Sequence, residues 1–305
     1  MINKRLVTLL LPSLFLMAGE FGYTQVYVVP PQTAQLRLDR IDYVSKSDGV
    51  PVLIRSFHRT EPERGIFGTG WCSNLDVRLL GVGERQPSTL EIKTCGIQKK
   101  RTFRKILEAW VEDSSPSRIL RAQDGRWEMT EAPYMIFRQD GMLDSFVTDD
   151  DVRWYVRRDA KGRPEALDNL KQRPAKFRRN YAGDLEAILD ANGKPFVKYG
   201  LGAVLTSVEI AGVLETYEYD ANGSVSKLTR KPKGGKPSVW NFSYKSDGQL
   251  SLARDPDGCT TRWTFEQTQD EWSVLEKKDC QQFEDKPSGE RSPKRRSPSM
   301  LKRQW

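Results

Sequence analysis

The sequence predicts an all-β protein in which repeated β-hairpins form one curved, spiralling sheet. The first observation is a glycine that returns every 19 to 25 residues from Gly141 to Gly248. Leu or Val usually stands two residues after this glycine and an apolar residue five after it, as Leu185 and Ile188 follow Gly183. Such a period indicates two short strands and two turns per repeat, because helical solenoid repeats are longer.

The second observation is the turn chemistry. Asn or Asp stands directly before glycine in Asn192-Gly193, Asn222-Gly223, Asp247-Gly248 and Asp257-Gly258. This pair is a strong hairpin signal, since the primed two-residue turns need positive φ. Between turns the residues alternate, as in Trp240–Tyr244, which places rings on one face of a strand. The repeat turns are therefore predicted at Gly183, Gly202, Gly223 and Gly248.

The elements before the repeats are also predicted to be strands. Residues 25–60 alternate in the manner of strands, and residues 71–147 continue as short strands separated by turns. Residues 103–111 lack a clean helix cap and lie among strands, so we expect strand there too. No interior linker is evident from composition. An N-terminal β region, residues 25–135, is expected to continue directly into a repeat region, residues 136–280.

Two repeats carry a tyrosine before the turn: Tyr219-Asp220-Ala221-Asn222-Gly223-Ser224-Val225 and Tyr244-Lys245-Ser246-Asp247-Gly248-Gln249-Leu250. They resemble the tyrosine-aspartate repeats of the Rhs family, although Lys245 replaces the usual Asp. Upstream, Arg55–His58 followed by Gly65-Ile66-Phe67-Gly68-Thr69-Gly70-Trp71 resembles the entry motif of that family. The resemblance covers most of residues 50–265, and the motif residues Gly65, Phe67, Gly68, Gly70 and Trp71 are its most specific part.

Large Rhs proteins use many repeats to wrap a shell around a C-terminal toxin. This sequence has about six repeats and then a short tail, so the resemblance implies an open sheet and not a closed cocoon. Large members also cut themselves at Asp-Pro-x-Gly-Leu, with a proline five residues before the aspartate. Here Leu250 stands in place of that proline and Cys259 follows Gly258. We therefore expect Asp255–Gly258 to be an ordinary turn.

The two ends of the sequence differ from its body. Residues 1–19 combine Lys4 and Arg5 with an apolar run of 13 residues, which predicts a signal peptide and export to the periplasm or beyond. This run is too short to span a bilayer comfortably, and no transmembrane span is expected after its removal. Residues 281–305 carry seven basic and three acidic side chains and little to bury. They predict a disordered basic tail, which supplies half of the net charge of +8.

Export governs the interpretation of the four cysteines. They form two local pairs, 23 and 21 residues apart. In an oxidising compartment the spacing predicts bridges Cys72–Cys95 and Cys259–Cys280, out of three possible connectivities. A metal site is not expected, because the sequence has no C-x-x-C and a single histidine.

No catalytic residue and no cofactor are predicted. His58, the only histidine, lies in a strand pattern and is interpreted as structural, which leaves no Ser-His-Asp triad. The acidic run Asp149-Asp150-Asp151 could in principle serve a two-carboxylate glycosidase, but such a run is usually a solvated turn.

Three functions remain open. The first is an exported, non-enzymatic binding or adhesion module for envelope carbohydrate or a cell surface, with Trp240, Tyr244, Trp263 and Tyr219 as the rings that stack on sugars. The second is a structural shell or carrier that packs against a partner effector protein. The third is a carboxylate-based glycan hydrolase. The tail could hold the protein near an anionic surface, whereas nucleic acid is not an expected partner of an exported chain.

Overall fold

The computed structural model describes residues 27–30, 33–44, 51–59, 64–82, 87–95, 100–149, 151–267, 272–280 and 300–303. The expected signal peptide, residues 1–19, lies outside the described residues. The described part is all-β and contains no helix, as the sequence predicts. Within it, no helix of the length and apolarity needed to cross a membrane is present.

Three of the strands form a small antiparallel sheet, ordered β1 (Arg37–Val44), β2 (Pro51–His58) and β5 (Trp71–Ser73). Between β2 and β5, the short strands β3 (Arg64–Gly65) and β4 (Gly68–Thr69) pair with each other. This small sheet is not foreseen from the sequence, which predicts one curved sheet.

All other strands belong to one long antiparallel sheet, in which each strand pairs with the next along the chain. They are β6 (Arg78–Leu80), β7 (Thr89–Lys93), β8 (Arg101–Ile106), β9 (Ala109–Glu112), β10 (Ser115–Gln123), β11 (Arg126–Met129), β12 (Met135–Arg138), β13 (Leu143–Val147), β14 (Arg153–Arg158), β15 (Pro164–Asn169), β16 (Gln172–Arg179), β17 (Leu185–Leu189), β18 (Pro195–Leu201), β19 (Leu205–Ile210), β20 (Val213–Tyr219), β21 (Val225–Pro232), β22 (Ser238–Tyr244), β23 (Leu250–Arg254), β24 (Thr260–Gln267), β25 (Trp272–Asp279) and β26 (Met300–Arg303).

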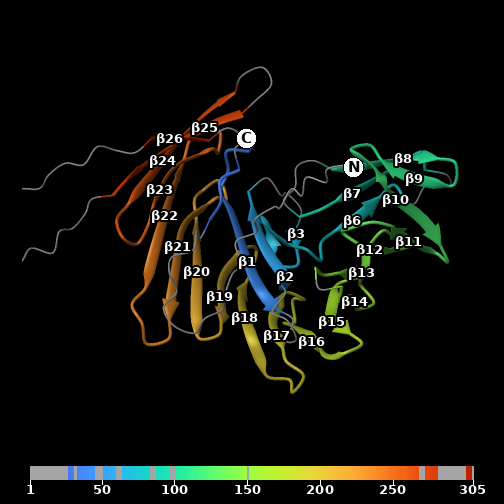
Figure 1. The fold of residues 1–305 in the computed structure, drawn as a ribbon. Coiled ribbons are helices and arrows are strands. Elements are labelled where there is room, and N and C mark those ends of the chain that lie inside the picture. Colours follow the sequence, from blue (N-terminus) through green and yellow to red (C-terminus); the bar gives the residue numbers. More distant parts are fainter. Residues whose placement is uncertain are drawn as a thin grey trace, which may run out of the picture.

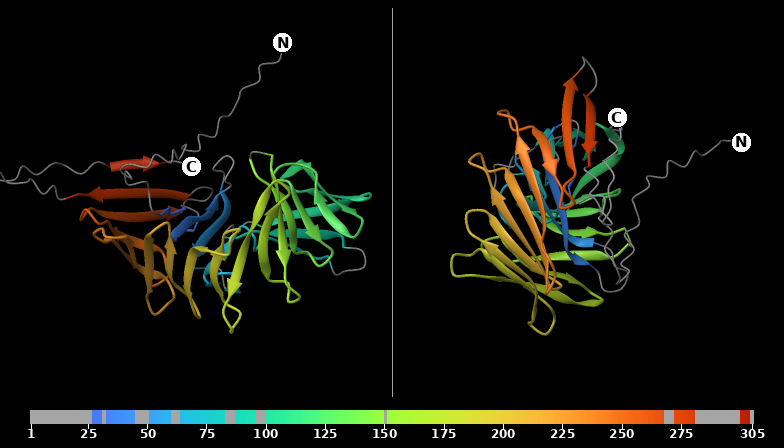
Figure 2. Two further views of the ribbon diagram at one scale, coloured as in Figure 1. Left: turned by 90° about the horizontal axis from the view of Figure 1, so that it is seen from below. Right: turned by 90° about the vertical axis from the view of Figure 1, so that its left-hand side faces the viewer.

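The long sheet is strongly curved, and the small sheet lies on its concave side (Figures 1 and 2). At the start of the long sheet the chain curls back, since Arg78 bridges Met142 and the Leu79 amide donates to the Gly141 carbonyl at 2.8 Å. The end strands β6 and β26 do not pair with each other in the part of the chain that the structure describes. The sheet is therefore open, as predicted.

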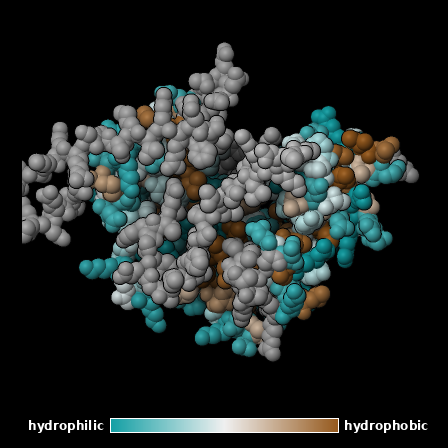
Figure 3. All heavy atoms as spheres, in the orientation of Figure 1, coloured by the Kyte–Doolittle hydropathy of each residue, from teal (hydrophilic) through white to brown (hydrophobic). Residues whose placement is uncertain are grey.

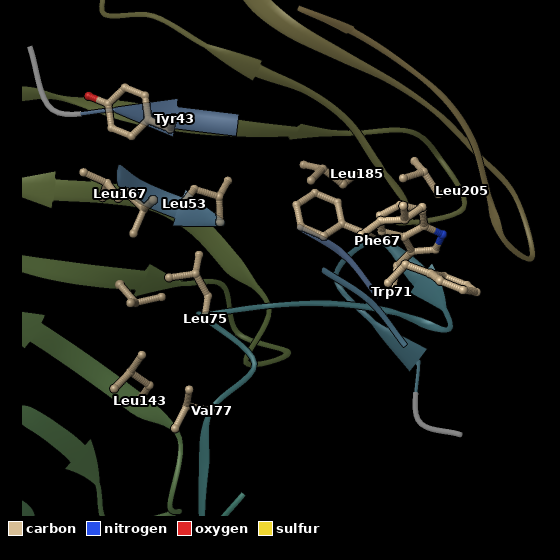
Figure 4. Close-up of a cluster of buried hydrophobic side chains, with 14 of the residues drawn as sticks. Tyr43, Leu53, Phe67, Trp71, Leu75, Val77, Leu143, Leu167, Leu185 and Leu205 are labelled. Carbon is tan, nitrogen blue, oxygen red and sulfur yellow. The ribbon is translucent and has the colours of Figure 1, made fainter. Parts of the chain in front are cut away.

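The periodic apolar positions of the repeats face the core. Leu143, Leu185, Val225 and Leu250, two residues after the repeat glycine, are at most 1% exposed. Figure 4 shows how the small sheet and the segment after it cover this face: Leu53 lies beside Leu167, Phe67 and Trp71 beside Leu185 and Leu205, and Leu75 and Val77 beside Leu143. The core thus lies between the two sheets.

The repeat turns use glycine as predicted, but in a wider loop than the two-residue primed turn. At Asn180–Gly183 the Gly183 amide donates to the Asn180 carbonyl at 2.9 Å, and the pairing register shifts beside the turn. Gly183, Gly223 and Gly248 have φ of 86°, 77° and 86°. This combination is a type I turn closed by a glycine bulge. Gly202 is the exception, because it lies in a bend and its φ is not positive.

The structure bears on three local expectations. Residues 103–111 are extended, in β8 and β9, as predicted. The boundary expected at residues 135 and 136 falls inside β12, so the long sheet crosses it without interruption. Of the tail expected to be disordered, residues 281–305, the structure describes 300–303 alone, and these form β26 against β25. The other residues of the tail lie outside the described residues, and its disorder stays a prediction.

We expect Gly223→Ala to lower the free energy of unfolding by about 1–2 kcal/mol, because an L-residue is disfavoured at positive φ. An added Cβ at Gly223 would meet nothing within 4 Å, so the backbone alone would cause the loss. The matched control is Gly202→Ala, where the space is also open but φ is not positive. It should be neutral or stabilise by up to about 1 kcal/mol. Urea unfolding measures both, and equal losses would contradict the turn assignment.

Candidate functional site

A buried cluster of charges and hydroxyls joins the small sheet to the long sheet. Arg55 on β2 and Asp42 on β1 are each 1% exposed, and Arg55 Nε lies 2.9 Å from Asp42 Oδ2. From the long sheet, the Tyr199 hydroxyl donates to Asp42 Oδ2 at 2.8 Å. Arg55 Nη1 donates to the Tyr217 oxygen at 2.9 Å, and Tyr217 donates to Glu215 at 2.6 Å. One hydrogen-bonded network therefore spans both sheets.

Glu215 is the carboxylate that the long sheet contributes. Arg40 Nε lies 3.2 Å from both of its oxygens. Arg55 Nη2 lies 3.8 Å from Oε2, and Arg230 Nε lies 3.9 Å from Oε1. Burial raises the pKa of Glu215, but Arg40 and Arg55 outweigh it and the pKa is lowered. Burial alone would lower the pKa of Arg55, but Asp42 and Glu215 outweigh burial and raise this pKa well above its usual value. Both groups are therefore held in their charged forms.

The glycine-rich entry motif forms the apolar wall around Arg55. Phe67 and Trp71 are fully buried, and the Arg55 guanidinium carbon lies 4.9 Å from the Trp71 ring centroid. The Trp71 indole donates to the Tyr219 oxygen at 2.8 Å. Gly68 has a φ of 91°, and a Cβ there would lie 3.3 Å from the Ala203 carbonyl oxygen. The motif thus fits the small sheet closely against the repeats.

The tyrosines before the repeat turns join each repeat to the one before it. The Tyr244 hydroxyl donates to the Val225 carbonyl at 2.7 Å, and the Tyr219 hydroxyl donates to the Leu205 carbonyl. Val225 and Leu205 are each the first residue of the second strand in the preceding hairpin. Burial is the largest cause that raises the pKa of Tyr219, to about 12, so the hydroxyl keeps its proton.

Arginine occupies the equivalent position in two earlier repeats. Arg158 donates from Nε to the Leu143 carbonyl at 3.3 Å, and Arg179 donates from Nη2 to the Pro164 carbonyl at 3.0 Å. Leu143 and Pro164 again begin the second strand of the preceding hairpin. The same backbone bond is made by a cation here and by a neutral hydroxyl at Tyr219 and Tyr244.

An aspartate at the start of a repeat turn holds that turn together. Asp220 Oδ1 accepts from the amides of Asn222 and Ser224, both at 2.9 Å. Asp255 Oδ1 does the same for the amides of Asp257 and Cys259, at 3.1 and 2.8 Å. These bonds satisfy amides that the turn would leave unpaired. The Asp-Pro-Asp-Gly stretch is therefore a turn, as predicted.

The four rings expected to bind sugars are buried or half-buried. Trp240 and Trp263 belong to the core, with exposures of 4% and 7%. Tyr219 and Tyr244 are half-buried and bond backbone carbonyls. The structure thus brings Tyr219 against Trp71 and leaves the four rings without a common exposed face. Their sugar-binding role stays a prediction.

The remaining sequence candidates have structural surroundings. Both predicted disulfides, Cys72–Cys95 and Cys259–Cys280, are formed. Asp149 and Asp151 are exposed in the turn after β13, while Asp150 lies outside the described residues. His58 ends β2, and its Nε2 atom is buried without a hydrogen-bond partner among the residues that the structure describes. In the described ranges, no group of three or more His, Cys, Asp or Glu residues is placed to hold a metal ion.

Sequence reasoning missed a basic groove that lies between the β3–β4 hairpin, the segment after β5 and the repeat turns. Arg64, Arg158 and Arg179 are among its lining residues, and its volume is about 310 Å³. The sequence signal that could have revealed this groove is arginine, at Arg158 and Arg179, in the repeat position where Tyr219 and Tyr244 stand later in the chain.

We expect Arg55→Met to lower the free energy of unfolding by about 3–5 kcal/mol, since Asp42 and Glu215 would lose their shared buried cation. The control is Lys198→Met, which breaks the exposed Lys198–Glu209 pair at 3.1 Å. That loss should stay below about 1 kcal/mol. Urea unfolding measures the free energy of unfolding of both variants. Similar losses in the two would show that the buried cluster stabilises the fold no more than an exposed ion pair does.

A pH dependence follows from His58, whose pKa burial lowers to about 4, with Arg37 adding to the effect. The unfolded chain binds a proton below its ordinary pKa of 6.5, whereas the folded chain does not until about pH 4. Stability therefore falls as pH decreases through this window. His58→Gln should remove about 2–3 kcal/mol of that fall. Unfolding free energies of both proteins at pH 7 and 4.5 test this, and parallel pH profiles would contradict it.

No protein-family model and no curated protein matches the sequence. Similar solved structures include a crystal structure of TcdB2-TccC3-Cdc42, with TM-score 0.31 and 12% identity over 63% of this chain and 14% of that one. The Tc holotoxin pore of Photorhabdus luminescens gives TM-score 0.34 and 11% identity over 80% and 15%. A crystal structure of TcdB2-TccC3 gives 0.29 and 9% over 80% and 17%. This chain thus spans less than a fifth of the length of those chains. Similarity at this level does not assign it to a family, and the resemblance to Rhs repeats rests on the motifs named above.

Proposed function

We propose that this chain is an exported, non-enzymatic shell or carrier module that packs against a partner protein. The observation that carries the proposal is an apolar hairpin tip between β8 and β9. Ile106 is 57% and Leu107 is 87% exposed. Figure 3 shows apolar residues gathered at the end of the molecule that carries these strands. Exposed apolar groups that gather in one place are typical of interaction surfaces.

The backbone of this tip adds to the argument. Leu107 has a φ of 58°, a conformation that costs a leucine about 1–2 kcal/mol. Glycine or asparagine would fit there at lower cost. A leucine that is both strained and almost fully exposed contributes little to its own fold. We therefore interpret it as a contact residue for another molecule.

The filled interior of the molecule favours a module that packs against a partner protein over a shell that encloses a cargo. The strands β1, β2 and β5 occupy the concave side of the long sheet, where a cargo would otherwise lie (Figure 2). Two disulfides within the body support export, since such bonds persist in oxidising compartments. Carbohydrate binding by ring stacking is the weaker candidate, because its two tryptophans lie in the core.

The test is native co-isolation with the wild-type protein and with the double variant Ile106→Ser, Leu107→Gly. Wild type should co-isolate one stoichiometric protein from an envelope extract, and the double variant should lose it. Glycine suits the positive φ at position 107, so the loss should come without a large loss of stability. Leu170→Ser, which changes a leucine that is 91% exposed on another turn, is the control and should retain the partner.

Two outcomes would contradict the proposal. The first is a wild-type protein that isolates as a clean monomer. The second is equal recovery of the partner with the double variant. Capture by envelope polysaccharide in place of a protein would instead favour the adhesion function.

A further inference from the structure

A groove with an excess of positive charge lies where the β3–β4 hairpin and the segment after β5 meet the turns β14–β15 and β16–β17. Its volume is about 310 Å³. Two of the side chains that line it are carboxylates, Asp76 and Asp184, and six are cationic: Arg64, Arg78, Arg158, Lys161, Arg163 and Arg179.

Only some of these cations have a carboxylate partner. Arg64 pairs with Asp184, and Arg163 Nη2 lies 2.7 Å from Asp159. Arg158 and Arg179 form no ion pair within the described ranges. Arg158 bonds the carbonyls of Leu143, Gly162 and Leu75, and Arg179 bonds those of Gly183 and Pro164. Their positions are fixed by backbone carbonyls, and no carboxylate of the described ranges lies within ion-pair distance of either guanidinium.

The surroundings of the two arginines make that charge costly. Burial is the largest cause that lowers the pKa of Arg158, and the nearby cations Arg138 and Arg78 lower it further, while Asp76 acts in the opposite direction. Burial and Arg163 lower the pKa of Arg179, and they outweigh the opposite effect of Asp159, Asp184 and Asp76. Asp76, below the groove, already accepts bonds from the Ser73 amide at 2.7 Å and the Ser73 hydroxyl at 3.0 Å.

The repeat architecture does not require this cost. Tyr219 and Tyr244 make the equivalent bond to the preceding repeat with a neutral hydroxyl. Two adjacent repeats therefore carry half-buried cations where the later repeats show that a tyrosine suffices. Costly charge gathered in one groove indicates a function that the fold does not explain.

We propose that this groove binds a phosphate group. Arg158 and Arg179 provide a fixed positive floor, and the exposed side chains of Arg78 and Lys161 reach the phosphate oxygens from the rim. A phosphate monoester is favoured over a carboxylate, because its charge of about −1.5 to −2 near neutral pH compensates more than one cation. Arginine and lysine together are also suited to phosphate oxygens.

The test uses calorimetric titration of the mature protein with three probes: inorganic phosphate, phosphomannan and the same mannan stripped of phosphate. Arg158→Tyr combined with Arg179→Tyr removes both floor charges while offering the hydroxyl used at Tyr219 and Tyr244. Affinity for the phosphate probes should fall at least about tenfold. Arg78→Gln combined with Lys161→Gln changes exposed residues only, keeps the fold, and should weaken binding several-fold. Lys231→Gln, an exposed cation outside the groove, should leave it unchanged.

The probes distinguish the source of the phosphate. Binding of inorganic phosphate alone supports a site for the free ion, and binding of phosphomannan but not stripped mannan supports a phosphorylated polymer. The proposal is overturned if neither phosphate probe binds, if stripped mannan binds equally well, or if both groove variants retain wild-type affinity. A loss in Lys231→Gln equal to that in the groove variants would also overturn it, since general surface charge would then explain binding.

Discussion

The buried Arg55 guanidinium is the group on which the arrangement of the two sheets depends. A buried charge is tolerated only when it is paired and hydrogen-bonded. Asp42 comes from the small sheet, but Tyr217 and Glu215 come from the long sheet. Arg55 is therefore fully satisfied only when both sheets meet in one register. The network makes this packing specific, and the apolar contacts around it supply most of the favourable free energy.

The same repeat position serves two purposes along the chain. At Tyr219 and Tyr244 it bonds the preceding repeat with a hydroxyl, whereas at Arg158 and Arg179 it makes that bond and adds a positive charge. A change of one residue type thus leaves the hairpin geometry intact and alters the electrostatics of the groove. This separation lets a repeat protein acquire a local site without a change of fold.

Local features of the structure could be predicted from the sequence, and long-range ones could not. The positive φ of Gly223 and the pairing of Cys259 with Cys280 depend on nearby residues, and both were predicted. Alternation around Trp240 indicates two faces of a strand but not which face is buried, so it does not predict the burial of this ring in the core. The small sheet on the concave side and the basic groove depend on contacts between distant segments. Arg158 and Arg179 line one groove only because consecutive repeats stack side by side.

Hydrogen–deuterium exchange of the strands β2 and β20 tests the central claim, that the small sheet and the long sheet form one cooperative body joined at Arg55. The account predicts that amides of β2 exchange as slowly as those of β20, with opening free energies near that of global unfolding. Arg55→Met should accelerate exchange in both strands together. Fast exchange of β2 in the wild-type protein, while β20 stays protected, would show that the small sheet detaches by itself and would contradict the account.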